Sequence, residues 1–105
     1  MYELSKPQLK WLRKESHQHK PIFQMGKNGL TEAFYEQVDE ALEKRELVKI
    51  SLLQNTSEEL EETANRLSQA LEANIVQTIG STIVLYRRSH NKKNRKISEE
   101  VRRAR

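Results

Sequence analysis

Residues 20–32 read KPIFQMGKNGLTE, and this stretch contains a strand, a glycine-bounded loop and the start of a helix. Pro21 is incompatible with the interior of a helix, and the apolar side chains after it predict a short strand over residues 22–25. Gly26 ends this strand, and Thr31 is a typical N-cap for a helix that begins just after it. A strand that leads through a short loop into a helix is typical of α/β domains.

Periodic patterns on both sides of this stretch extend the alternation of helices and strands. Upstream, Ser5 and Gln8 have the spacing of a capping box, which predicts a helix that begins near residue 6. Downstream, Thr56 and Glu59 repeat that spacing before another amphipathic segment. The predicted elements are a helix at 6–16, a strand at 22–25, a helix after Thr31, a strand at 47–53, a helix after Thr56, and strands at 75–79 and 82–87 around Gly80 and Ser81.

The order of these elements predicts the fold class. Strands separated by helices need crossover connections, which favour parallel pairing. The last two strands are joined by only two residues, so they must be antiparallel. We therefore expect a single compact α/β domain of order α-β-α-β-α-β-β, whose mixed four-stranded sheet is packed with helices.

Length and composition limit what this chain can be. Its 105 residues give room for one domain. It contains no cysteine, which excludes disulfides, thiolate metal sites and cysteine nucleophiles. No apolar run approaches the roughly 20 residues of a membrane-spanning helix, and the N-terminus has no signal-peptide pattern. We therefore expect a cytoplasmic protein with no membrane partner.

The charge is distributed unevenly along the chain. Residues 1–30 carry six basic and two acidic side chains, residues 31–80 carry four and eleven, and residues 81–105 carry nine and two. The net charge of +4 therefore combines an acidic middle with basic ends. A domain with this pattern can attract a polyanion to one surface and repel it from another, which favours nucleic acid as a partner.

The loop GKNG, residues 26–29, has the composition of a turn that binds a sugar-phosphate backbone. Its two glycines permit positive φ angles and close approach of a bulky ligand. The following helix offers free amides and a partial positive charge, to which Lys27 adds a full charge and Asn28 an amide. Asn-Gly is also common in simple turns. The loop matches neither the Walker pattern nor the dinucleotide pattern, so nucleotide hydrolysis is not expected.

Three blocks of the sequence resemble one known family, the CRM (chloroplast RNA splicing and ribosome maturation) domain in its bacterial stand-alone, YhbY-like form. The blocks are residues 20–32, residues 41–50 and residues 76–87. The resemblance covers residues 5–88 and keeps the blocks in the family's order. Two positions depart from it, because Glu15 and His19 stand where the family pattern has apolar residues.

The resemblance implies an RNA-binding domain over residues 1–88, similar in fold to the C-terminal domain of a bacterial translation initiation factor. It also implies association with precursors of the large ribosomal subunit through ribosomal RNA, and a role in ribosome assembly. By the family pattern, RNA contacts carry over to Gly26, Lys27, Asn28, Gly29, Lys20 and Arg87. Other basic side chains are expected to add electrostatic affinity. These are Lys10, Arg13, Lys14 and Arg88.

Two alternative functions remain open. The acidic helices could dock a basic ribosomal protein or an assembly factor, which would make the chain a protein-interaction module. Residues 89–105 form a basic tail that the resemblance does not cover, and this tail could bind DNA as in a nucleoid protein. We expect the tail to be flexible, or to become helical on a partner.

The remaining candidate residues have structural explanations. His17 and His19 lack a third ligand at a suitable spacing, so we expect no metal site. Trp11 lies at the edge of the buried face of the first helix, where packing is favoured over stacking on a base. The acidic side chains lie on solvated helix faces, so we predict no catalytic residue and no enzyme. We also expect no cofactor, no small-molecule substrate and a monomer.

Overall fold

The helices and strands alternate in the predicted order. The computed structural model describes residues 3–54, 56 and 58–104. Its elements are α1 (Lys6–Ser16), β1 (Phe23–Met25), α2 (Glu32–Arg45), β2 (Leu47–Leu52), α3 (Leu60–Leu71), β3 (Asn74–Ile79), β4 (Thr82–Tyr86), the 3₁₀ turn η1 (Lys92–Asn94) and α4 (Lys96–Arg103). The predicted order α-β-α-β-α-β-β is confirmed, and η1 and α4 follow it.

The four strands form one mixed sheet in the order β1-β2-β4-β3. β1 runs parallel to β2, with Met25 opposite Leu52. β4 runs antiparallel to β2, with Tyr86 opposite Leu47, and antiparallel to β3. The predicted mixed pairing is therefore confirmed. It follows from the connections, because a helix returns the chain for the parallel pair and a two-residue turn joins β3 to β4.

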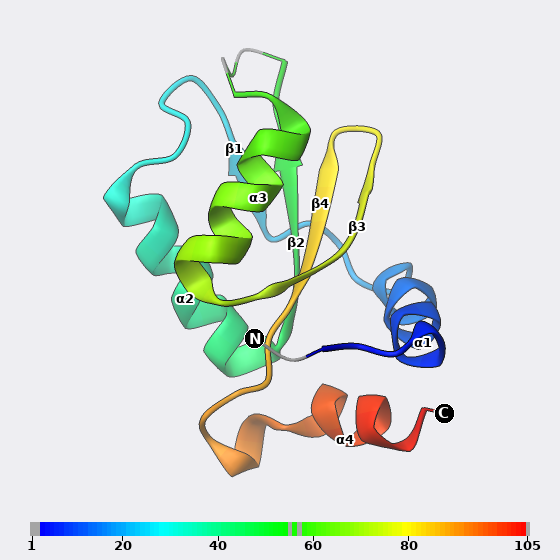
Figure 1. Ribbon diagram of the computed structural model, residues 1–105. Helices are drawn as coiled ribbons and strands as arrows, with labels where there is room; N and C mark the ends of the chain where they lie inside the picture. Colours follow the sequence, from blue (N-terminus) through cyan, green and yellow to red (C-terminus); the bar gives the residue numbers. More distant parts are fainter. Residues whose placement is uncertain (1–2, 55, 57, 105) are drawn as a thin grey trace.

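Helices cover both faces of the sheet, α2 and α3 on one side and α1 and α4 on the other (Figure 1). The first core lies against α2 and α3 and includes Val48 and Ile50 of β2. The second core lies against α1 and α4 and includes Leu47 and Tyr86. Successive residues of β2 serve different cores because side chains of a strand alternate between the two faces of a sheet.

The predicted start of α1 is confirmed, whereas that of α3 is wrong. Ser5 Oγ accepts a hydrogen bond from the Gln8 amide at 3.2 Å, and Gln8 Oε1 accepts one from the Ser5 amide at 3.0 Å. At α3 the N-cap is Glu59 and not Thr56. The Glu59 carboxylate accepts hydrogen bonds from two amides of the first turn. A carboxylate nearer the apolar residues of the helix thus replaces the expected hydroxyl.

The two departures from the family pattern pair with each other. His19 Nε2 lies 2.9 Å from Glu15 Oε2, four residues earlier. Both side chains are half-buried, and their contact satisfies polar groups at positions where apolar residues were expected. The packing of α1 is retained, because Leu12 is fully buried beside them in the second core.

The C-terminal residues differ from the expected flexible tail. Val101 of α4 is only 4% exposed and belongs to the second core, and Ile97 packs against that core. Gln8 Nε2 of α1 also donates a hydrogen bond to the Val101 carbonyl at 3.1 Å. The expectation rested on the high charge of this segment, but two apolar side chains four residues apart give α4 a buried face. Arg105 lies outside the described residues.

Candidate nucleic-acid interface

The glycine loop, residues 26–29, forms a tight turn between β1 and α2. The Gly29 amide donates a hydrogen bond to the Gly26 carbonyl at 3.1 Å, which closes the turn. Lys27 and Asn28 occupy its two central positions, and both are exposed. The turn therefore presents a cation and an amide to solvent directly before α2.

The backbone of Gly29 has a conformation that favours glycine. It is buried and has a φ of +63°, in the left-handed region that favours glycine. A β-carbon at this position would lie 2.6 Å from Glu58 Oε1. Gly26 has no positive φ, so the expected use of permissive backbone applies to Gly29 alone. Glu58 flanks the loop at Gly29, and Lys27 and Asn28 form its exposed side.

A shallow hollow of about 240 Å³ lies between the glycine loop and the first turn of α2. Thr31 is the predicted N-cap, and its Oγ1 accepts a hydrogen bond from the Phe34 amide at 3.1 Å. The start of α2 adds partial positive charge, which favours an anion. Small-molecule sites usually measure roughly 300–1,000 Å³, so this hollow suits a backbone group better than a whole small ligand.

Most other predicted contacts lie away from the glycine loop. Lys10, Arg13 and Lys14 are exposed on α1, and Arg13 Nε donates a hydrogen bond to the Val76 carbonyl of β3 at 3.2 Å. Lys20 is exposed in the connection from α1 to β1. Figure 1 shows α1 and the β1–α2 loop at opposite ends of the molecule. The structure therefore separates the α1 cations from the loop.

Arg87 and the glycine loop lie at opposite ends of the strands of the sheet. Arg87 follows Tyr86, which is opposite Leu47 at the start of β2. The loop follows Met25, which is opposite Leu52 at the end of β2. Five residue steps of β2 separate these positions, a distance of about 17 Å. Arg87 and the loop therefore do not form one continuous contact site.

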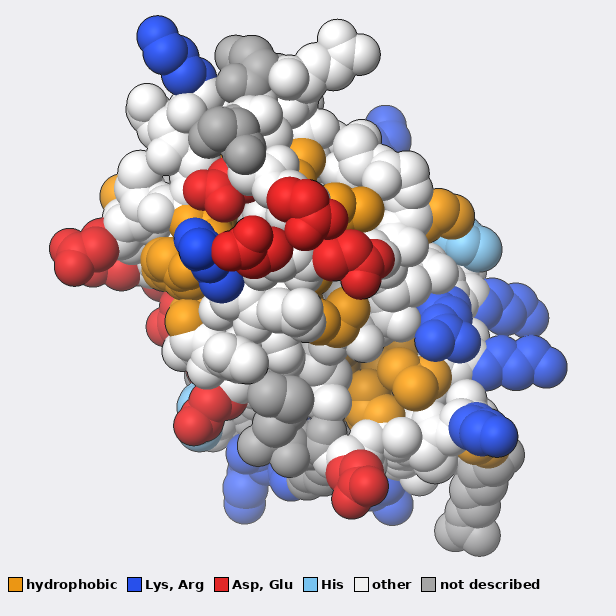
Figure 2. Space-filling model, turned by 45° about the horizontal axis from the view of Figure 1, so that its top comes forward, with side chains coloured by type: hydrophobic (Ala, Val, Ile, Leu, Met, Phe, Trp, Pro, Cys, Tyr) orange, Lys and Arg blue, Asp and Glu red, His pale blue; other side chains and the backbone are white. Residues whose placement is uncertain are grey.

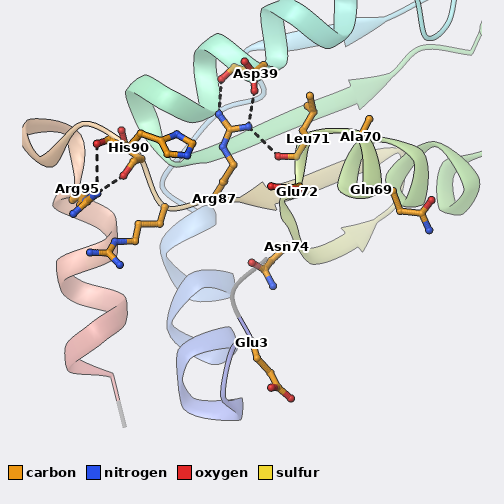
Figure 3. A pocket seen from close by; sticks show the side chains of 12 residues that line it. Glu3, Asp39, Gln69, Ala70, Leu71, Glu72, Asn74, Arg87, His90 and Arg95 are labelled. Atoms are coloured by element: carbon orange, nitrogen blue, oxygen red, sulfur yellow. Dashed lines mark hydrogen bonds and ion pairs between the residues drawn. The ribbon is translucent and has the colours of Figure 1, made fainter.

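The guanidinium of Arg87 lies between Asp39 of α2 and the carbonyl of Leu71 at the end of α3 (Figure 3). It donates hydrogen bonds to Asp39 Oδ1 at 2.6 Å and to the Leu71 carbonyl at 3.0 Å, and it pairs with Glu43 at 3.3 Å. Its side chain is only 12% exposed. It lines a hollow of about 780 Å³, larger than the one beside the loop, but its donors join β4 to α2 and α3. The structure therefore gives Arg87 a structural role, while Arg88 beside it is exposed.

A protein-family comparison decides which domain this geometry represents. The family model of the CRS1 / YhbY (CRM) domain matches residues 4–87, which include all four strands, α1 to α3 and the glycine loop. The chain belongs to the CRM domain family. The family membership predicted from the sequence is thus confirmed.

Several known proteins align with most of the chain. The probable RNA-binding protein YqeI of Bacillus subtilis strain 168 is 45% identical over 90 residues, 86% of this chain and 94% of the relative. An RNA-binding protein of Haemophilus influenzae is 34% identical over 93 residues, 89% of this chain and 94% of the relative. The solution structure of the hypothetical protein SAV1595 from Staphylococcus aureus matches with a TM-score of 0.71 and 43% identity, covering 86% of this chain and 94% of its own. None of these names describes an enzyme.

A buried carboxyl group of this CRM domain, missed in the sequence analysis, holds the C-terminal segment. Glu46 is fully buried and accepts hydrogen bonds from the amides of Ser89 at 2.7 Å and Ser98 at 2.9 Å, as well as from the Ser98 hydroxyl. It lies between the end of α2 and the start of β2. The sequence did contain one indication of this role, since Glu46 stands directly before an apolar strand. A carboxyl group buried at such a position needs hydrogen-bond partners.

Glu43 holds the same segment from the last turns of α2. Its carboxylate accepts hydrogen bonds from the Ser89 hydroxyl at 2.9 Å and from the His90 amide, and it lies 3.0 Å from His90 Nδ1. Burial opposes its ionisation, but the hydrogen bonds from the His90 side chain, the Ser89 hydroxyl and the His90 amide outweigh burial and lower the pKa of Glu43 to about 2. The segment after β4 is therefore attached through charge-assisted hydrogen bonds.

Charge is segregated on the surface of the CRM domain. Figure 2 shows acidic side chains gathered near the start of α3 and Lys and Arg side chains toward the side where α1 lies. We call Glu58, Glu59, Glu61 and Glu62 the acidic patch. Its member Glu58 borders the glycine loop. The bipolar distribution expected from the sequence therefore places acidic groups beside the loop as well as opposite α1.

The described residues set two further limits on the CRM domain. Within residues 3–54, 56 and 58–104, no helix combines the length and apolar character needed to cross a membrane. In the same part of the chain, no group of three or more His, Asp or Glu side chains is arranged to hold a metal ion. The His19 ring already contacts the carboxylate of Glu15.

Proposed function

We propose that this protein binds RNA through the glycine loop, and that its target is ribosomal RNA in precursors of the large ribosomal subunit. The observation that carries the RNA contact is the turn, which exposes Lys27 and Asn28 at the start of a helix. The names of the relatives support RNA as the partner class. The ribosomal target rests on the resemblance to bacterial stand-alone CRM proteins.

Basic side chains outside the loop extend this contact. Lys10, Arg13 and Lys14 on α1, together with Lys20 and Arg88, are exposed and add electrostatic affinity for phosphates. Arg87 is left out of this set because its side chain is only 12% exposed and its guanidinium pairs with Asp39 and Glu43. In this proposed role the protein acts without catalysis, as a cytoplasmic monomer that assists assembly of the large subunit.

The target is tested by crosslinking in cells and sequencing of the attached RNA. Crosslinks of the wild-type protein are expected to concentrate in one region of large-subunit ribosomal RNA and to be lost in the double variant Lys27→Ala/Asn28→Ala. Lys44→Ala is the matched control, because Lys44 is also exposed but lies in the last turn of α2, away from the loop. Scattered crosslinks that persist in the double variant would overturn the proposal.

The contact with phosphate is tested by measuring affinity against salt concentration. For single-stranded RNA, Lys27→Ala is expected to reduce the slope of log affinity against log salt by about 0.7, the value for one lost phosphate contact. Lys44→Ala is expected to leave the slope unchanged. Equal affinity for duplex DNA and structured RNA would contradict RNA as the partner and favour a nucleoid protein.

A second candidate function, a protein-interaction module, is favoured by the acidic patch (Figure 2). The test is the double variant Glu61→Lys/Glu62→Lys, which reverses exposed charges and leaves the N-cap Glu59 in place. Loss of this variant from precursor particles, with its affinity for purified RNA unchanged, would favour docking on a basic protein. Retention in the particles would favour RNA binding.

A further inference from the structure

Trp11 packs against the second core on one side and borders a hollow on the other. The side chain is half-buried, and its neighbour Leu12 is a fully buried member of that core. The hollow measures about 510 Å³. The residues that line it are Lys6, Pro7, Lys10, Trp11, Lys14 and Ala104. The packing role predicted for Trp11 therefore leaves part of the indole available to a ligand.

The hollow combines an apolar strip with a row of cations. Pro7 and Trp11 are four residues apart and share one side of α1. Lys6, Lys10 and Lys14 also repeat every four residues, about 6 Å apart along the helix axis, and we call them the lysine row. All three lysines are exposed, and none forms a salt bridge with a described residue. No acidic side chain among the described residues lines the hollow.

This combination fits an unpaired nucleotide. Aromatic side chains bind single-stranded nucleic acids by stacking on bases, and nearby cations follow the phosphates. A duplex keeps its bases stacked inside the helix, where an indole on a protein surface does not reach them. A second copy of this chain would bring one lysine row against another, and like charges would repel. The charge of the hollow therefore favours single-stranded RNA as its occupant.

We propose that Trp11 stacks on an unpaired base of the bound RNA, and that the lysine row contacts the phosphates beside that base. This inference rests on the proposed RNA-binding function and adds a second point of contact to it. The two contacts lie at opposite ends of the molecule, on α1 and on the β1–α2 loop (Figure 1). One RNA is thereby held twice, by its backbone at the glycine loop and by a base at Trp11.

The test uses the fluorescence of Trp11, which is the single tryptophan of the chain. A labelled, single-stranded oligouridylate is titrated with the full-length protein, and anisotropy and tryptophan emission are recorded together. Stacking predicts quenching that saturates at the same concentration as the anisotropy change. An abasic oligonucleotide of equal length keeps the phosphates and lacks the bases, so it is expected to bind roughly 10-fold more weakly and to cause no quenching.

Two variants separate stacking from packing. Trp11→Phe keeps an aromatic ring and is expected to retain most of the affinity, whereas Trp11→Leu keeps apolar bulk and is expected to lose roughly 10-fold. Thermal unfolding of both variants shows whether the second core is intact. Lys10→Gln is expected to lower the salt dependence without changing the quenching at saturation.

The outcomes distinguish this inference from the proposed function. Binding of oligouridylate seen by anisotropy, with unchanged tryptophan emission, overturns the inference and leaves RNA binding intact. Quenching by polyglutamate but not by RNA also overturns it and indicates an acidic protein segment as the occupant. Absence of binding to any single-stranded or structured RNA overturns both the proposed function and this inference.

Discussion

The carboxylate of Glu58 occupies the space that a side chain at position 29 would need, because a β-carbon on Gly29 would lie 2.6 Å from Glu58 Oε1. Gly29 also has a φ of +63°, which side chains rarely adopt. The backbone conformation therefore selects glycine, and a side chain at position 29 would in addition require the Glu58 side chain to move. A Gly29→Asp variant adds a second carboxylate at the same point, so it disturbs the folded loop as well as RNA binding. Lys27 and Asn28 are the better positions for testing the interface.

Replacement of Gly29 by alanine is expected to lower the free energy of unfolding by about 1–2 kcal/mol. The additional change Glu58→Ala removes the steric contact but not the backbone strain, so the double variant should recover only part of this loss. Urea denaturation of the wild type, both single variants and the double variant gives the coupling energy of the pair. Strictly additive effects would contradict the contact between the two residues.

Replacement of Glu46 by glutamine is expected to lower the free energy of unfolding by about 2–3 kcal/mol, because an amide nitrogen would face a backbone donor inside the protein. Hydrogen exchange should show faster exchange in α4. The matched control is Glu72→Gln. Both glutamates are C-caps with positive φ, but Glu46 is buried and Glu72 is exposed, so the control should be nearly neutral. Equal losses for both variants would rule out the role of the buried carboxyl group.

Glu43 makes stability depend on pH, because its pKa is lowered from 4.5 to about 2 in the folded protein. The ionised form is favoured by folding, so its contribution is complete above pH 4.5 and is lost as the pH falls toward 2. Its upper limit is about 3 kcal/mol, reduced by solvent screening. Urea unfolding of wild type and Glu43→Gln at several pH values should show a difference that disappears near pH 2. A difference that is constant with pH would contradict this assignment.

Replacement of Arg87 by alanine is expected to lower the free energy of unfolding by about 1–3 kcal/mol, since it removes the hydrogen bond to the Leu71 carbonyl and the cation beside Asp39, while Glu43 keeps its contacts with Ser89 and His90. The folded fraction should bind RNA as the wild type does, because the guanidinium already has protein partners. Thermal unfolding and RNA titration at a temperature where the variant is folded provide the two measurements. Weaker RNA binding with unchanged unfolding would return Arg87 to the interface.

Local chemistry explains which parts of the fold the sequence predicts. Short-range effects on the backbone predict the strand, the glycine loop and the start of the next helix. The residues that exert these effects are Pro21, Gly26 and Thr31. The start of α3 is predicted one turn too early because residue preferences favour Thr56 over Glu59 as an N-cap. Preferences of this kind rank residue types, but they do not show which side chain reaches the free amides of the first turn.

Contacts between distant residues explain what the sequence does not predict. The order of the C-terminal segment depends on Glu43 and Glu46, which lie more than forty positions before their partners. Arg87 belongs to a basic run in the sequence, and only the return of α2 along the sheet brings Asp39 beside it. In the candidate interface, composition indicated which residues are basic. The topology decides which of them are near the loop and which are already paired.

The contact between α1 and α4 joins two helices that lie far apart in the sequence, so α1 is synthesised well before its partner. The second core lacks Val101 until that residue has been added to the chain, although Leu12 and Tyr86 are already present. At about 5–20 residues per second, the interval between Tyr86 and Val101 lasts on the order of one to three seconds. Until Val101 packs against the second core, the apolar surface that it covers stays open. A chain stalled before α4 is therefore expected to be a substrate for chaperones and proteases.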